Sequence, residues 1–224
     1  MRAEDALAAL KARADKAAAA RMAAYHKADR TYLGLPNPEI AALVAEWRGA
    51  LDLPGRVALA DALWRSDIFE ARVAAAKLLV QARIRDDEPV WRLVLSWAAD
   101  FDSWAIADHA ADVGARRLAA APERLEEIEP WTRDDNLWIR RAALTFTLPW
   151  AKSRHPDAAD LARRERVLGW AAGYAADREW FIQKAVAWWL RTLSKHDPAR
   201  VRAFLEDHGG AMKPFARREA AKYL

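Results

Sequence analysis

The chain of 224 residues contains no cysteine and only eight glycines. Without cysteine, disulfides and cysteine-type zinc sites are excluded, and a reducing compartment is permitted. Long uncharged apolar runs are also missing, which argues against a membrane-spanning helix. The N-terminus is charged and rich in alanine, without the apolar core of a signal peptide. We therefore expect a cytoplasmic protein with no membrane partner.

The residues that are abundant favour a folded helical chain. Hydrophobic residues make up 53% of the sequence and charged residues 30%, which is typical of a folded protein and not of a disordered one. Alanine and leucine dominate, β-branched runs are few, and no segment alternates as a strand would. Twelve tryptophans are an unusually large number for this length, and most of them must pack between helices.

The charge is unevenly distributed. Residues 134–224 carry 17 Lys and Arg against 11 Asp and Glu, whereas residues 1–133 carry 19 against 21. The C-terminal part is thus basic, which suggests a polyanionic partner. Solvated helix faces are often basic as well, so the charge alone does not identify the partner.

Local signals divide the chain into about twelve helices. Capping residues followed by proline or by an apolar run predict helix starts, and glycine or a Pro-containing break predicts ends. The predicted starts are Asn37-Pro38, Asp135 or Asn136, and Asp197-Pro198; the predicted ends or breaks are Asp112-Val113-Gly114, Ser153-Arg154-His155-Pro156 and His208-Gly209-Gly210.

Four short runs share one pattern, in which small or apolar residues flank a variable, usually basic centre, and residues 107–111 form a fifth, degenerate run. Taking one equivalent position from each run gives spacings of 35, 33, 43 and 34 residues, which is the period of stacked helix pairs. We therefore predict an all-α fold, a right-handed α-solenoid of HEAT-like helical repeats that forms a single domain over residues 1–224. The runs are residues 71–75, 107–111, 139–143, 182–186 and 216–220, and the equivalent positions are Val73, Asp108, Arg141, Lys184 and Arg218.

The repeat register places a set of polar and aromatic residues on one concave face. Apolar and alanine residues of each run face the core. The groove, whose basic residues can follow a phosphate backbone, is expected to be lined by Asp108, Arg141, Lys184 and Arg218. Trp104 lies four residues before Asp108, and Trp188 four residues after Lys184, so each tryptophan shares a helix face with a groove residue. Residues expected to contact DNA from these runs are Arg72, Lys184, Arg217 and Arg218.

These residue types suit the removal of a cationic base from DNA. A purine alkylated at N3 or N7 leaves as a neutral base and needs no general acid. A carboxylate such as Asp108 can stabilise the developing sugar cation and orient water. Aromatic faces hold cationic groups, and basic side chains hold flanking phosphates.

The chain resembles the AlkD-type DNA alkylation repair glycosylases, which are built from HEAT-like repeats. The similarity extends from about Tyr25 to the C-terminus, and four segments in order carry it. These segments are Tyr25 to Glu39, which includes Tyr32-Leu33-Gly34-Leu35-Pro36-Asn37-Pro38; Trp97 to Asp108, which includes Phe101-Asp102-Ser103-Trp104; Asp135 to Ala143; and Phe181 to Arg191.

The resemblance implies excision of N3- and N7-alkylated purines such as 3-methyladenine and 7-methylguanine from duplex DNA, as in base excision repair. It also implies the roles of individual residues. Trp104 and Trp188 match aromatic contacts to the lesion deoxyribose, Asp108 matches the catalytic carboxylate, and Arg141 matches the basic residue beside the lesion phosphate. Tyr25 matches an aromatic at the edge of the site, and Arg191 matches a backbone contact. We expect no metal or other cofactor, and we expect a monomer.

The sequence departs from the family at two positions, and it is compatible with other functions. Ala105 stands where the family often has an acidic residue, and Pro149 where a basic one is common. Asp108 could instead cap a helix or pair with Arg141. A non-catalytic repeat protein that binds branched or damaged DNA, and a protein-binding scaffold, are the alternative functions. The tryptophans expected to serve packing alone are Trp97, Trp131, Trp138 and Trp170.

Overall fold

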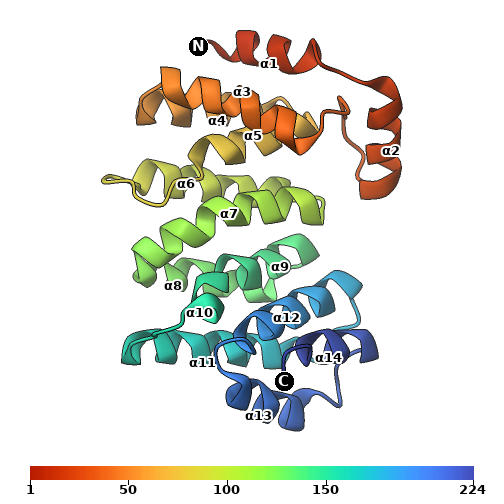
Figure 1. Ribbon diagram of the computed structural model, residues 1–224, viewed down its shortest axis with the longest axis vertical. Coiled ribbons are helices and arrows are strands. Elements are labelled where there is room, and N and C mark those ends of the chain that lie inside the picture. The colour runs from red at the N-terminus through yellow and green to blue at the C-terminus, as the bar shows by residue number, and fades with distance from the viewer. The chain divides into compact units, whose positions relative to one another are not determined.

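The computed structural model describes all 224 residues and consists of helices joined by short loops (Figure 1). It has fourteen α-helices and three short 3-10 helices, and the one strand-like pairing is an isolated bridge between Thr31 and Ile68. The prediction of an all-α fold is confirmed. The expected number of helices was too low, partly because α8 and α10 have only four and five residues and leave little periodic signal.

The chain divides into two compact units, residues 1–117 and 118–224. The prediction of one repeat domain over residues 1–224 concerns how these units join, and it stays a prediction. The first unit contains α1 (Ala3–Lys11), α2 (Lys16–His26), α3 (Asn37–Ala50), α4 (Leu53–Arg65), α5 (Phe69–Leu79), α6 (Glu88–Ser96), η1 (Trp97–Asp100) and most of α7 (Trp104–Ala120).

The second unit begins with three short helices and continues mostly with longer ones. It contains η2 (Pro122–Arg124), α8 (Leu125–Ile128), η3 (Glu129–Arg133), α9 (Leu137–Phe146), α10 (Leu148–Lys152), α11 (Ala158–Gly173), α12 (Trp180–Leu193), α13 (Pro198–His208) and α14 (Pro214–Ala220). Within it α12 packs against both α9 and α14, whereas in the first unit α5 packs against α3 and α4.

Most predicted helix boundaries are confirmed. The side chain of Asn136 accepts a hydrogen bond from the amide of Trp138 at the start of α9, and Asp197 caps α13 in the same way. Helix α13 ends at His208, and residues 153–157 separate α10 from α11. Asn37 is the first residue of α3 and not its cap, because Pro36 occupies that position.

One predicted boundary is wrong. Residues 112–114 do not end a helix, because α7 continues through them to Ala120. A glycine inside a helix costs about 1 kcal/mol relative to alanine. Buried contacts on either side, at Val113 and Leu118, outweigh that local preference.

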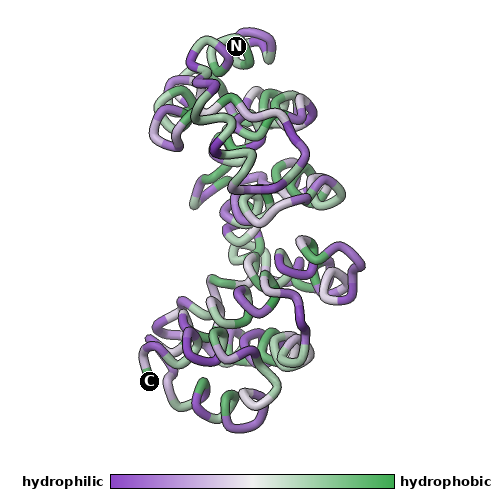
Figure 2. Tube along the Cα trace, turned by 90° about the vertical axis from the view of Figure 1, so that its right-hand side faces the viewer, coloured by the Kyte–Doolittle hydropathy of each residue, from purple (hydrophilic) through white to green (hydrophobic).

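Each of the five runs lies on a helix, and its small residues are buried. Ala71, Ala107, Ala142 and Ala216 have no exposed surface, and Ala185 exposes only 1%. Helix α5 is the most enclosed, since all of its residues except Lys77 are buried. Hydrophilic and hydrophobic positions alternate along the helices of each unit (Figure 2), as amphipathic helices require.

A buried carboxylate connects α5 to the loop that follows α2. Glu70 accepts hydrogen bonds from the backbone amides of Leu33, Gly34 and Leu35 at 2.9, 2.7 and 3.3 Å. Gly34 has a φ of +87°, and a Cβ there would lie 2.2 Å from the carbonyl oxygen of Asp15. The loop is therefore held in one conformation, which places the end of α2 against α5 and α7.

Candidate functional site

Helix α7 presents Trp104 and Asp108 on one face. The helix begins at Trp104, and the three residues between it and Asp108 are buried, whereas Trp104 and Asp108 themselves are half-buried. Their spacing of four residues puts the two side chains one turn apart. Ala105, which departs from the family's usual acidic residue, exposes 5% of its surface and belongs to the core.

Two residues at the end of α2 pack against Trp104. The ring of Tyr25 lies 6.1 Å from that of Trp104, edge to face, and Tyr25 is 69% exposed. The ring of His26 lies 5.5 Å from that of Trp104. Both distances are in the range of aromatic pairs. The predicted neighbours Tyr25 and Trp104 are thus brought together, and Tyr25 presents an open aromatic surface beside them.

His26 is a site residue that the sequence analysis missed. Its ring stacks on Phe69 at 4.7 Å and lies parallel to that of Tyr32 at 5.9 Å, so aromatic rings surround it. Burial lowers the pKa of His26, an effect that the nearby carboxylate of Glu70 opposes. The one feature of the sequence that could have indicated His26 is its position directly after Tyr25. The ring of His26 packs against that of Trp104, and the lowered pKa favours the neutral form of the imidazole.

His109 follows Asp108 but lines a different part of the first unit, a pocket shared with α3 and α5. Burial and the ammonium group of Lys77 lower its pKa to about 4, although Asp108 acts in the opposite direction. His109 is therefore neutral at physiological pH.

The prediction that Arg72 contacts DNA requires correction. Arg72 exposes only 5% of its surface, and its guanidinium donates hydrogen bonds to the carbonyl oxygens of Trp64 and Asp100 at 3.1 and 3.2 Å. It also pairs with Asp67 at 3.0 Å, which itself adopts a positive φ of 57°. Burial lowers the pKa of Arg72. Arg72 stabilises the first unit and has no surface free for a phosphate.

In the second unit, Arg141 and Trp188 lie close together. Arg141 on α9 donates a hydrogen bond of 2.9 Å to the carbonyl oxygen of Phe181, and its guanidinium carbon lies 5.9 Å from the centroid of the Trp188 ring. This distance is that of a cation–π contact. Trp188 is half-buried, whereas Trp189 beside it is fully buried and donates to Thr147.

Lys184 and Arg191 share one carboxylate. Glu219 on α14 accepts from the Lys184 ammonium at 3.0 Å and from the Arg191 guanidinium at 2.6 Å. The side chains of Lys184 and Arg191 remain 39% and 32% exposed, and that of Glu219 is 17% exposed. The two predicted phosphate contacts are thus on one face of α12, with Glu219 between them.

An exposed aromatic pair borders these cations and was also missed. Trp180 at the start of α12 is 47% exposed, stacks on Phe215 at 5.5 Å, and has the Lys184 ammonium 5.5 Å from its ring centroid. The sequence feature that could have indicated Trp180 is its spacing of four residues from Lys184.

Of the tryptophans expected to serve packing, Trp97 and Trp170 are buried, and Trp131 and Trp138 are half-buried and pack on phenylalanines.

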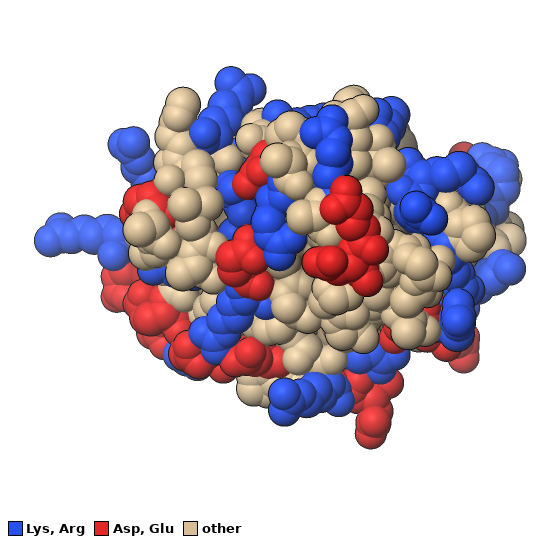
Figure 3. Space-filling model, turned by 90° about the horizontal axis from the view of Figure 1, so that it is seen from below, with Lys and Arg blue, Asp and Glu red and all other residues tan.

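Arg217 and Arg218 are exposed on α14. The face drawn in Figure 3 carries Lys and Arg side chains interspersed with Asp and Glu, not one continuous basic patch.

Nowhere in the chain do three His, Cys, Asp or Glu side chains lie close enough together to hold a metal ion. None of the helices has the length and apolar character needed to cross a membrane.

The protein is all-helical and carries aromatic and charged residues on partly exposed helix faces. The family model for DNA alkylation repair enzymes matches residues 6–224. The chain therefore belongs to the DNA alkylation repair enzyme family. No curated protein matches the chain.

Solved structures share the fold. A structure described as a predicted DNA alkylation repair enzyme from Enterococcus faecalis is similar with a TM-score of 0.78 and 24% identity, covering 94% of this chain and 96% of that one. AlkD2 from Streptococcus mutans gives a TM-score of 0.60 at 18% identity, covering 84% of this chain and 89% of its own. The smu.31 protein from Streptococcus mutans UA159 gives 0.61 at 18%, covering 84% and 92%.

Proposed function

We propose that the protein is a monofunctional DNA glycosylase that hydrolyses the N-glycosidic bond of purines alkylated at N3 or N7, such as 3-methyladenine and 7-methylguanine, in duplex DNA. The observation that carries the proposal is the pair on α7. Trp104 and Asp108 lie one turn apart on the same face of this helix, beside the exposed ring of Tyr25.

The proposed chemistry needs little more than a fixed negative charge. The bond between C1′ and the base nitrogen breaks with its electron pair going to the cationic base, which leaves neutral. Water then adds to C1′ and releases one proton. Asp108 stabilises the positive charge that develops on the sugar and orients this water.

Most of the remaining residues bind the substrate. Trp104 and Trp188 offer aromatic faces to the deoxyribose and to cationic groups, and Tyr25 adds an exposed aromatic edge. Arg141 is 4% exposed and donates to the carbonyl oxygen of Phe181, so the prediction that it binds the lesion phosphate requires the same correction as for Arg72. Its guanidinium lies against Trp188 and positions that ring. Lys184, Arg191, Arg217 and Arg218 contact the flanking backbone.

The test is a release assay with methylated duplex DNA. Asp108→Asn keeps the size of the side chain and removes its charge, so we expect the rate of 7-methylguanine release to fall by about 10²–10³-fold. Because Asp108 acts on the transition state, binding of undamaged duplex should change little. Asp61→Asn, an exposed carboxylate on α4 that pairs with Arg65, is the control and should release base at the wild-type rate.

Two results would contradict the proposal. If Asp108→Asn releases 7-methylguanine as fast as the wild type, Asp108 is not the catalytic carboxylate. If the wild type binds methylated duplex but releases no base, the protein is a non-catalytic binder of damaged or branched DNA.

A further inference from the structure

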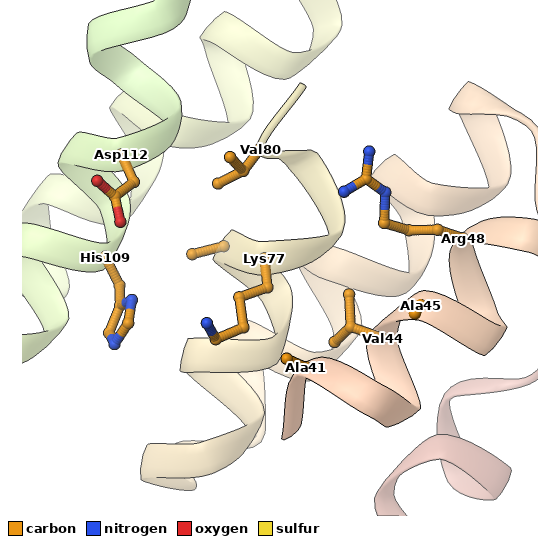
Figure 4. A pocket seen from close by; sticks show the side chains of 9 residues that line it. Ala41, Val44, Ala45, Arg48, Lys77, Val80, His109 and Asp112 are labelled. Carbon is orange, nitrogen blue, oxygen red and sulfur yellow. The ribbon is translucent and has the colours of Figure 1, made fainter. Parts of the chain in front are cut away.

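A small pocket opens between α3, α5 and α7 of the first unit, and Lys77 reaches into it (Figure 4). The pocket has a volume of about 260 Å³. Most of its walls are formed by small side chains, which leave the cavity open: Ala41, Val44, Ala45, Ala76 and Val80. The polar side chains in it are Arg48, Lys77, His109 and Asp112.

Lys77 is unusual in its helix. Every other residue of α5 is buried, which makes Lys77 the one position where this helix meets solvent. Its ammonium group points across the pocket toward His109 (Figure 4). A lysine at the only open position of a core helix places a positive charge at a fixed point of the pocket wall.

The two cations of the pocket have no partner within the chain. Neither Lys77 nor Arg48 makes a hydrogen bond or an ion pair with another residue, unlike Arg72, Arg117 and Arg141, which all do. Asp112 contributes one negative charge, so the pocket has a net positive charge. A half-buried cation without a partner has lost part of its water and gains when an anion approaches.

The pKa of His109 depends on the charges in this pocket. Burial and Lys77 lower its pKa to about 4, and Asp108 and His26 are the other charged or titratable groups that act on it. Arg48 and Asp112 face it from the same pocket. An anion placed between Lys77 and His109 would reverse the effect of the lysine and raise this pKa.

We propose that this pocket is a binding subsite for a phosphate group, held by Lys77 on the side that faces His109. A DNA backbone phosphate is the source that follows from the proposed function, on which this part of the inference rests. His109 and Asp112 bring α7 into the pocket wall, so a phosphate here would bind the duplex beside the helix that carries Asp108. Free inorganic phosphate has the same chemistry and is the second possible source.

The first experiment measures binding of undamaged duplex DNA between 50 and 200 mM salt for the wild type and Lys77→Met. Each phosphate contact contributes about 0.9 to the slope of log affinity against log salt. We therefore expect Lys77→Met to weaken binding by about 3–4-fold more at 50 mM than at 200 mM salt. Arg65→Met, an exposed arginine paired with Asp61, should keep the wild-type slope.

The second experiment follows the pKa of His109 by proton NMR, with and without inorganic phosphate and with and without duplex DNA. Phosphate or DNA in the pocket should raise this pKa. Lys77→Met should raise it in the free protein, because a positive charge is removed, and should abolish the further rise on addition of either ligand. A preserved NMR spectrum of the variant shows that it remains folded.

The outcomes separate the two sources and the two proposals. A rise with DNA and a reduced salt slope identify a backbone phosphate, whereas a rise with inorganic phosphate alone identifies a free-phosphate site. No rise with either ligand, together with an unchanged slope, overturns the subsite. Neither experiment depends on base release, so a failed release assay would refute the glycosylase and leave the subsite standing.

Discussion

At the scale of single residues, burial decides which charged groups serve the fold and which can bind. Arg72 and Lys77 are five residues apart on α5, yet Arg72 is buried against carbonyl oxygens and Lys77 reaches a pocket. The repeat pattern predicts which positions are equivalent but not how far a long side chain extends. Arg72 turns toward Asp67, whose unusual backbone conformation the sequence does not reveal.

His109 should make the stability of the protein depend on pH. The pKa of His109 is about 4 in the folded protein, against an ordinary value of 6.5. Between these values the unfolded chain binds more protons, so the free energy of unfolding falls as the pH drops below 6.5. We expect His109 alone to remove about 2 kcal/mol between pH 7 and pH 5.

Urea unfolding at pH 7, 6 and 5 checks this expectation. His109→Leu should lose most of the pH dependence in this window, while His155→Gln, a change at an exposed histidine, should keep it. An equal dependence in wild type and His109→Leu would show that His109 is readily protonated in the folded protein.

At the scale of elements, a carboxylate on α14 reduces the positive charge on the exposed face of α12. Glu219 neutralises part of the charge of Lys184 and Arg191, which lie two turns apart on α12. A DNA phosphate that binds either cation has to compete with this carboxylate. We expect Glu219→Gln to tighten binding of undamaged duplex at low salt and to steepen its salt dependence, because both cations become available.

Fluorescence binding titrations between 50 and 200 mM salt would measure this effect. Glu165→Gln, which removes the exposed partner of Arg200, is the matched control and should leave the slope unchanged. Glu219→Gln should also unfold at a lower temperature than the wild type. The partly buried carboxylate of Glu219 makes two ion pairs, which together stabilise the fold by about 1 kcal/mol or more. Looser DNA binding in a folded Glu219→Gln would mean that the carboxylate positions the cations and does not restrain them.

Helices α7 and α12 show what the sequence could and could not predict. The spacing of Trp104 and Asp108 on α7 follows from helix periodicity, and the structure places both on one partly exposed face. The contact from Glu219 to α12 joins residues 28 and 35 positions apart, and no local rule gives the direction of its side chain. His26 escaped notice because its role depends on rings from α2, α5 and α7, which only the packed unit brings together.

At the scale of the whole molecule, the distribution of charge along the chain was readable from composition. The basic excess of residues 134–224 comes from side chains of unequal availability, however. Arg164 is buried against the carbonyl oxygen of Trp150, and Arg200 pairs with Glu165. Net charge therefore overstates the number of cations that can meet a phosphate, and their surroundings must be considered one by one.

Arg217 and Arg218 are the exposed cations of α14, and they provide the test at this scale. If both contact the DNA backbone, the double variant Arg217→Gln/Arg218→Gln should lower the slope of log affinity against log salt by about 1.8. The paired change Arg2→Gln/Arg65→Gln removes the same charge from two exposed positions in the first unit and should leave the slope near its wild-type value. Equal losses in both double variants would mean that net charge alone, and not a defined basic surface, governs attraction to DNA.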